Sequence, residues 1–387
     1  MANSIKFSLL SARPAHTKLA QAMQSLTGMG RKICVVALAL CFPAFAAVET
    51  AAATSAAQDD ADAGYTAGFG EAKKEAGHSV APVVGYDPTY KFVVGAAYFY
   101  VSERVNFGLD ANTNFNGVYQ VHARASHQFF DRWNYDLRLA GMKGFEAYYG
   151  DGGDTSAANY QQLWGDRYAA RLQLNHQLTD YFSVGVFGEL RGRTEEAVAN
   201  AAFTRVAPDQ SVGAAGVSVK LDSRKNKQRS DDGVVFTTEL LRSFSDRPFT
   251  QLESSFVVYK DVMGDFFPGV VAAFQVAGGI SDGDVPFTYR YRFGGAGKMR
   301  GYLENRFRGS RYYLQQTELR VPIWRMIGGA LSLGFGDISD REFTNPKMSY
   351  GFGLRIGLPP DWVSQIRIDI GFARDQMGVF AEFGQTF

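Results

Sequence analysis

The chain alternates between apolar and polar residues over long stretches, from about residue 86 to its end. In "SQIRIDIGFARD", Ile366, Ile368 and Ile370 share one face of an extended segment, while Arg367 and Asp369 share the other. Successive strand residues point to opposite faces, so a period of two predicts β-strands with one apolar and one polar side. The same period recurs in "RYAARLQLNHQL", "YFSVGVFGELRG" and "SYGFGLRIGL".

A soluble β-sandwich also alternates, and three observations favour a membrane barrel over it. The segments are longer than the about five or six residues of an average strand, and they suit the roughly nine to eleven residues of a tilted membrane strand. Their polar faces carry Arg, Glu and Asp at mid-strand, as a water-filled lumen allows. The chain has 19 Tyr and 31 Phe, which is typical of aromatic girdles. The predicted fold is all-β, a transmembrane antiparallel β-barrel, because lipid leaves open sheet edges without partners.

The alternating segments number sixteen, an even number as single-chain bacterial barrels require. The segments begin near Phe92, Asn106, Val118, Asn134, Tyr168, Phe182, Val212, Val234, Leu252, Val270, Phe287, Tyr312, Ala330, Tyr350, Gln365 and Met377.

The first 46 residues have the pattern of an export signal. Arg31 and Lys32 precede the uncharged "ICVVALALCFPAFAAV", which is shorter than the roughly twenty residues of a spanning helix. Ala-Phe-Ala at 44–46 has the small-residue spacing of a signal-peptidase site. Residues 1–46 are therefore predicted to be a signal peptide. A short anchor helix and a lipoprotein signal ending at Cys41 are the alternatives.

Residues 47–85 are rich in Ala, Gly and charge, a composition that cannot bury a core, and are predicted to be a flexible periplasmic tail before a barrel at 86–387. Both cysteines, Cys34 and Cys41, lie in the leader, so the mature chain would have no thiol. Removing the leader takes away five basic residues and changes the formal charge from 40 − 39 = +1 to 35 − 39 = −4. That balance argues against a nucleic-acid partner.

The stretch "FGGAGKMRGYLENRFRG" at 293–309 breaks the strand period. A phosphate-binding loop would lead into a helix through Lys-Ser or Lys-Thr, and here the following residues read as a strand. The stretch, with "YYLQQTELRVPIW", "LSLGFGDISD" and "GFGLRIGLP" after it, resembles the BamA/TamA superfamily of outer-membrane barrels, also called bacterial surface antigens. The resemblance covers about residues 84–387.

This resemblance implies a sixteen-stranded barrel in the outer membrane of a Gram-negative bacterium. Its sixth extracellular loop is expected to fold into the lumen, with an Arg-Gly-Tyr tip whose arginine pairs with a carboxylate on the wall. Asp337 in "GFGDIS" is the expected first partner, although it shares a face with apolar residues such as Phe335. Asp369 and Glu318 are the backup partners. The loop motif consists of Gly294, Gly295, Arg300, Gly301 and Tyr302.

The C-terminal "MGVFAEFGQTF" looks like the terminal strand that outer-membrane assembly machinery recognises, with Phe383 and Phe387 as its signal. The expected partners are outer-membrane lipid, the barrel assembly machinery during biogenesis, and a client protein or lipid. Only about forty residues separate the leader from the first expected strand. The resemblance therefore implies a bare barrel without the periplasmic repeat domains of family members that insert or secrete proteins.

By resemblance, the function is outer-membrane protein or lipid assembly, or translocation through a pore. The rival is a passive channel or structural surface antigen without assembly activity. An enzyme ranks third, because no Gly-x-Ser-x-Gly nucleophile elbow is present. The five histidines have no ligand spacing, so neither a metal site nor a cofactor is predicted. The basic run at 223–229 is either a solvated loop or a lipopolysaccharide contact.

Overall fold

The computed structural model describes residues 77–195, 197–198, 209–224, 230–264, 266–357 and 365–383. All of them belong to the compact unit Glu49–Phe387. The predicted leader at 1–46, most of the predicted tail, the basic run at 225–229 and Phe387 lie outside the described residues.

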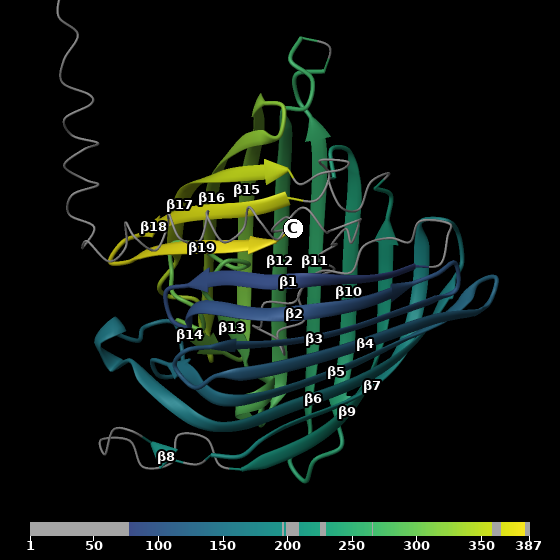
Figure 1. Cartoon of the computed structure of the whole chain (residues 1–387). Helices are drawn as coiled ribbons and strands as arrows, with labels where there is room; N and C mark the ends of the chain where they lie inside the picture. The colour runs from purple at the N-terminus through teal and green to yellow at the C-terminus, as the bar shows by residue number, and fades with distance from the viewer. Residues whose placement is uncertain are drawn as a thin grey trace, which may run out of the picture. The chain divides into compact units, whose positions relative to one another are not determined.

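Sixteen long antiparallel strands form a closed barrel in the described part of the chain (Figure 1). Each strand pairs with the next along the chain, and β1 pairs with both β2 and β19, which closes the sheet. The barrel strands are β1 (Gly77–Asp87), β2 (Lys91–Val101), β3 (Val105–Asn114), β4 (Tyr119–Phe130), β5 (Trp133–Tyr148), β6 (Gln161–Gln177), β7 (Phe182–Arg193), β9 (Gln210–Asp222), β10 (Gly233–Ser243), β11 (Phe249–Asp261), β12 (Val271–Gly283), β15 (Arg311–Trp324), β16 (Ile327–Ser339), β17 (Lys347–Gly357), β18 (Gln365–Ala373) and β19 (Met377–Phe383).

Five short elements lie in the connections. One end of the barrel, called here the turn end, carries tight connections such as 102–104 and 131–132, and the opposite, loop end carries the longer connections 149–160 and 284–310. The short elements are β8 (Ala197–Val198), β13 (Tyr291–Phe293), β14 (Phe307–Gly309) and the 3₁₀ turns η2 (Ala157–Asn159) and η3 (Phe287–Tyr289).

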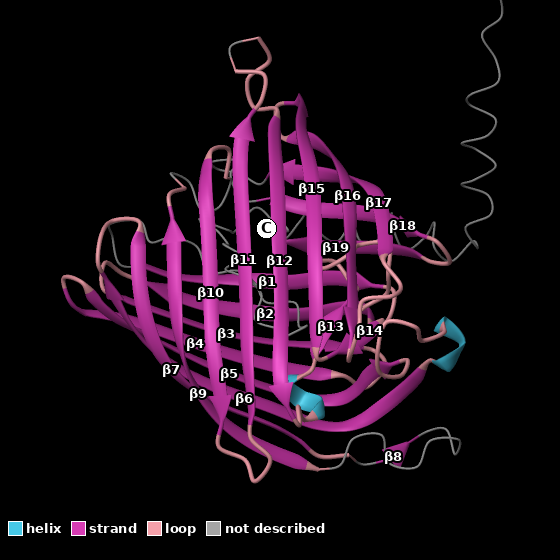
Figure 2. Cartoon of the chain, turned by 180° about the vertical axis from the view of Figure 1, so that it is seen from behind, coloured by secondary structure: helices cyan, strands magenta, loops and turns pink. Residues whose placement is uncertain are grey.

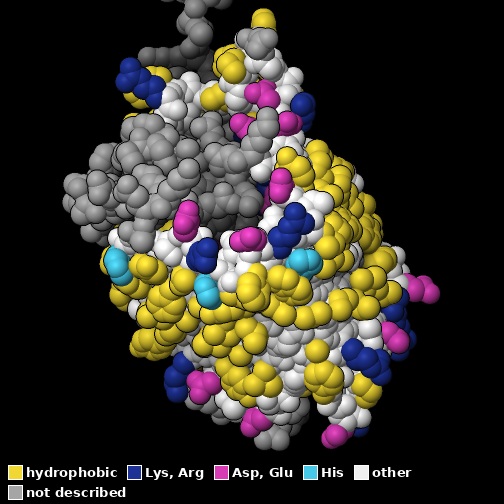
Figure 3. Space-filling view, turned by 90° about the vertical axis from the view of Figure 1, so that its right-hand side faces the viewer, with side chains coloured by type: hydrophobic (Ala, Val, Ile, Leu, Met, Phe, Trp, Pro, Cys, Tyr) yellow, Lys and Arg dark blue, Asp and Glu magenta, His cyan; other side chains and the backbone are white. Residues whose placement is uncertain are grey.

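The two faces of the wall have the chemistry that the alternation predicts. Leu172 and Phe352 are about half exposed on the outside, whereas Arg171, Arg367 and Asp369 point inward and are buried. A band of hydrophobic side chains crosses the outer surface, with charged side chains gathered mainly beyond its edges (Figure 3). This band is the surface that a bilayer would cover, because lipid-facing strand residues are apolar.

The predicted count of sixteen strands is right, but one predicted segment is not a barrel strand and one barrel strand was missed. The segment near Phe287 is not a barrel strand; it contains η3 and β13, and β13 pairs only with β14 in a separate small sheet (Figure 2). The missing strand is β1, which begins at Gly77 inside the predicted flexible tail and moves the barrel boundary forward from 86. Pro82 hid this strand, since proline is unfavourable in central strands. The segment from Phe287 onward was predicted to be a strand because its aromatic residues alternate with polar ones.

The contact that closes the barrel is short among the described residues. β1 pairs with β2 along its whole length, from Gly77↔Val101 to Asp87↔Lys91. Against β19 the only registered pair is Tyr86↔Ala381. We call this contact the β1–β19 seam.

Candidate functional site: a loop in the lumen with two anchors

The connection 284–310 between β12 and β15 packs inside the barrel. Its β13 and β14 pair through Tyr291↔Gly309 and Phe293↔Phe307. Apolar side chains of the connection join side chains of the wall in one buried cluster: Ala277, Tyr291, Phe293, Met299, Tyr302, Phe307, Tyr312, Leu314 and Ile338. We call residues 284–310 the lumenal loop.

The glycines of the motif allow the tight backbone path at the tip of this loop. Gly294 and Gly295 have φ angles of 115° and 93°, which side chains with a Cβ rarely adopt. The N–H of Gly294 donates to the carbonyl of Lys298 at 2.9 Å, and that of Gly295 donates to the carbonyl of Tyr302 at 3.0 Å. The tip therefore has a defined fold of its own.

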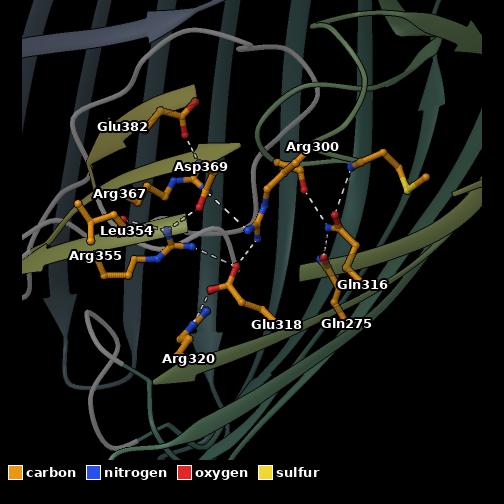
Figure 4. Close-up of polar contacts among 12 residues, drawn as sticks. Gln275, Arg300, Gln316, Glu318, Arg320, Leu354, Arg355, Arg367, Asp369 and Glu382 are labelled. Carbon is orange, nitrogen blue, oxygen red and sulfur yellow. Dashed lines mark hydrogen bonds and ion pairs between the residues drawn. The ribbon is translucent and has the colours of Figure 1, made fainter. Parts of the chain in front are cut away.

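The side chain of Gln316 on β15 ties this tip to the wall. Its Oε1 accepts from the N–H of Met299 at 3.1 Å, and its Nε2 donates to the carbonyl of Gly297 at 2.9 Å (Figure 4). Met299 has a φ of 69°, a conformation unusual for a residue with a side chain. The two hydrogen bonds hold the backbone on either side of Lys298.

Arg300, at the tip, points into an ion-pair network on the inner wall. Its Nη2 contacts Oε2 of Glu318 on β15, and its Nη1 lies 3.6 Å from Oδ2 of Asp369 on β18 (Figure 4). The side chain of Arg300 is 5% exposed and that of Glu318 is fully buried. The structure thus brings Arg300 to both backup partners.

Further arginines share the same carboxylates. Arg320 Nε lies 2.7 Å from Glu318 Oε1. Arg355 bridges Asp369 at 2.6 Å and Glu318 at 3.3 Å. Arg367 lies 3.5 Å from Asp369 and also contacts Glu382. In total, four guanidinium groups face three carboxylates, so the charges nearly balance. We call this set the Arg300 network: Arg300, Glu318, Arg320, Arg355, Arg367, Asp369 and Glu382.

Two wall glycines, Gly371 and Gly378, let the backbone of the tip approach the wall beside this network, and we call them the glycine seat. Gly371 on β18 faces Gly378 on β19. A Cβ at Gly371 would lie 2.3 Å from the carbonyl oxygen of Arg300, and one at Gly378 would lie 3.0 Å from it. A Cβ at Gly301 would lie 2.3 Å from the carbonyl oxygen of Phe372. Only glycine permits this close contact between backbones.

Asp337, the partner expected first, does not contact Arg300. Its carboxylate accepts from the N–H of Ile338 at 2.8 Å, from the N–H of Asn345 at 3.0 Å and from Nζ of Lys347 at 2.8 Å. It lies near the loop end of β16, two residues before Ser339. Asp337 is buried at this end of the strand, and Lys347 pairs with it instead of Arg300.

A second anchor, which the sequence did not predict, lies on β5 to β7. Glu146 on β5 contacts Arg308 Nη2 and lies 3.4 Å from Arg292 Nη2, both from the β13–β14 hairpin. Two arginines of the wall also lie near Glu146 Oε2, with Arg167 Nη1 at 3.1 Å and Arg193 Nη1 at 3.9 Å. We call these five residues the Glu146 cluster. The available signals were a lone Glu in the apolar "GFEAYYG" and two arginines beside the loop motif.

The connection 149–160 covers the loop from the loop end of the barrel. The N–H of Gly152 donates to the carbonyl of Arg308 at 2.6 Å. Arg306 donates to Thr155, with 2.7 Å from Nη1 to Oγ1 and 2.5 Å from Nη2 to the carbonyl. Burial lowers the pKa of the Arg306 guanidinium, and it raises the pKa of the neighbouring Tyr302 hydroxyl. The loop is therefore enclosed by wall and connection.

Other candidate sites are not supported in the part of the chain that the structure describes. That part contains no group of three or more His, Cys, Asp and Glu side chains arranged to hold a metal ion. Among the described residues, no helix has the length and apolarity needed to cross a membrane. Phe383 is the last residue of β19 as described, and Phe387 lies beyond the described residues.

Solved structures share this fold. BamA from Haemophilus ducreyi, lacking POTRA domains 1–3, matches with a TM-score of 0.59 and 12% identity over 80% of this chain and 70% of that one. CdiB from Escherichia coli matches with a TM-score of 0.60 and 12% identity, over 79% and 62%. CdiB from Acinetobacter baumannii matches with a TM-score of 0.54 and 10% identity, over 81% and 60%. The chain thus spans about six tenths of the two CdiB chains.

At these identities the likeness shows the fold alone. No curated protein matches the sequence. The family model described as "Omp85 superfamily domain" matches residues 105–387, which includes the barrel from β3 onward and the whole lumenal loop. The closed sixteen-stranded barrel agrees with that match, and the chain belongs to the Omp85 superfamily.

Proposed function

We propose that this protein acts in the outer membrane of a Gram-negative bacterium, where it assembles outer-membrane proteins or lipids or translocates a polypeptide. The match of residues 105–387 to the Omp85 superfamily carries the proposal, and we propose that the β1–β19 seam is where the barrel opens. BamA and CdiB, which share the fold, support the same general role. We propose no catalytic activity and no cofactor.

Locking the seam with a disulfide tests this function. Cysteines at Tyr86 and Ala381, which are Cα partners, should form a bond across the seam. The oxidised protein should lose assembly or translocation activity, measured as a change in the outer-membrane proteome of cells that depend on it, and reductant should restore the activity. Cysteines at Thr238 and Ser254, paired between β10 and β11, are the matched control. Full activity with the seam locked would overturn the proposal.

A passive channel is the rival function, and the charged inner wall is the observation that favours it. Single-channel conductance separates the two. A passive channel should conduct steadily, and deletion of its gene should cause no defect in outer-membrane assembly. A plugged assembly barrel should conduct weakly until the lumenal loop is released, since Arg300 and Glu146 hold that loop in the lumen.

The location and processing are part of the same proposal. The signal peptide at 1–46 should be removed, and residues before β1 should remain periplasmic. Mass spectrometry of outer-membrane fractions should find an N-terminus near Ala47, and a mature protein that retains Cys34 would contradict this. The C-terminal strand with Phe383 and Phe387 is proposed to engage the barrel assembly machinery, so removal of Phe387 should lower the yield of inserted barrel.

A further inference from the structure

The Glu146 cluster carries more positive charge than its carboxylate can neutralise. Four guanidinium groups lie within 4.0 Å of the single Glu146 carboxylate, two from the wall and two from the loop. Glu146 and Arg308 have side chains only 1% exposed, and Arg193 is 2% exposed. Like charges repel strongly when water is excluded, so this arrangement favours an additional anion.

Several donor groups of the cluster are left without a hydrogen bond. Nε and Nη1 of Arg193, Nε of Arg292 and Nε of Arg308 are buried and make no hydrogen bond. An unsatisfied buried donor on a charged group is costly, and native proteins rarely leave one. The two arginines that carry three of these four atoms, Arg193 and Arg308, come from the wall and the loop respectively. A ligand that accepts from both would connect the two parts.

Nearby acidic groups do not remove the excess. Glu195 acts on Arg193, and with it counted two carboxylates face four guanidiniums. Glu304 also attracts Arg292 electrostatically. Burial, together with the charges of Asp87 and Glu382, raises the pKa of the Glu304 carboxyl well above its usual range, which favours its neutral form. Among the residues that the structure describes, positive charge therefore remains in excess.

An aromatic ring fixes the orientation of two of the guanidiniums. The ring centroid of Phe287 in η3 lies 3.8 Å from the Arg308 guanidinium carbon and 4.7 Å from that of Arg193. Nη1 of Arg308 also donates to the carbonyl of Phe287 at 2.9 Å. A guanidinium held over a ring keeps its planar set of donors pre-organised for an oxyanion.

We propose that the Glu146 cluster is a binding site for a phosphate-type oxyanion, which Arg193 of the wall and Arg292 and Arg308 of the lumenal loop hold together. Guanidinium groups bind phosphate oxygens through paired hydrogen bonds, and this chemistry is common to free phosphate and to the phosphate of a lipid headgroup. Such an anion would fasten the lumenal loop to β7. The site is independent of the assembly function proposed above.

Calorimetric titration of the purified full chain in detergent, in phosphate-free buffer of constant ionic strength, tests the site. One arm uses inorganic phosphate, and the other uses bicelles that contain phosphatidic acid against bicelles of phosphatidylcholine alone. We expect saturable binding in at least one arm and affinity reduced by about tenfold or more in Arg193→Gln. Saturation by inorganic phosphate identifies a free anion, and saturation only by phosphatidic acid identifies a lipid headgroup.

Two controls keep the result interpretable. Arg138→Gln changes a lumen-facing arginine that pairs with Asp136 outside the cluster, and it should bind as the unaltered chain does. Arg292→Gln changes the loop side, and it should weaken binding even if Arg193→Gln fails to fold. Folding of each variant is checked by its heat-dependent mobility in detergent gels. No saturable binding in either arm, or equal affinity in Arg292→Gln and Arg138→Gln, would overturn the proposal.

Discussion

The two anchors of the lumenal loop differ in how they are neutralised. In the Arg300 network, Glu318 and Asp369 are each shared by three arginines, Glu382 pairs with Arg367, and four positive groups face three negative ones. In the Glu146 cluster, one carboxylate serves four arginines. When one acid of the first network is lost, the arginines that bridge two acids still have another carboxylate beside them, whereas the four guanidiniums of the Glu146 cluster have one carboxylate within 4.0 Å among the described residues. The attachment through the Arg300 network should therefore survive the loss of one acid better than the attachment through the Glu146 cluster.

The largest expected effect is that of removing the single acid. In phosphate-free buffer, Glu146→Gln leaves four guanidiniums without their shared carboxylate and should destabilise the barrel by about 3–5 kcal/mol. Glu318→Gln should cost less, because Asp369 still lies beside Arg300 and Arg355. The midpoint of heat-induced loss of the folded form in detergent gels measures both. A larger loss for Glu318→Gln would reverse the comparison.

Removing the arginine at the tip should have an intermediate effect. Arg300→Ala takes away one donor, while Arg320 and Arg355 remain on Glu318, so we expect a cost of about 1.5–3 kcal/mol. The barrel should stay folded and the loop should loosen. Limited proteolysis should then cut near 295–310, and conductance should rise. Wild-type resistance to protease would show that the Glu146 cluster alone holds the loop.

The glycine seat should respond more weakly. Gly371→Ala places a Cβ against the carbonyl of Arg300, and the overpacking should cost about 1–3 kcal/mol. Gly188→Ala on β7, where a Cβ would meet nothing within 4 Å, is the control. The readout is the protease sensitivity of the lumenal loop relative to that of the control. Equal sensitivity of the two variants would mean that the tip does not rest on β18.

The smallest perturbation comes from paired cysteines that report position alone. Cysteines at 300 and 369 should cross-link with a short bifunctional reagent, since Arg300 and Asp369 form an ion pair. Cysteines at 300 and 337 should not, because Asp337 is bonded to Lys347. The yield of each cross-link is measured in isolated outer membranes. The opposite order of yields would place the tip near the loop end of β16.

Local alternation was sufficient to predict the barrel because the strand period depends only on neighbouring residues. Ile366, Arg367 and Asp369 therefore took the faces that the sequence predicts. The same rule failed where other factors compete. β1 was not predicted because it contains Pro82. The aromatic residues that alternate from Phe287 to Phe293 were predicted to form a strand, but they are apolar because they lie in a buried loop.

The sequence by itself determined which residues could meet in the lumen, and the tertiary structure decided which of them do. Parity allowed Glu318 and Asp369, and both pair with Arg300, whereas Asp337 pairs with Lys347. No local pattern joins Arg308 to Glu146, which lies 162 residues away along the chain. Strand tilt and the path of the lumenal loop bring these charges together, and both are properties of the closed sheet rather than of any segment.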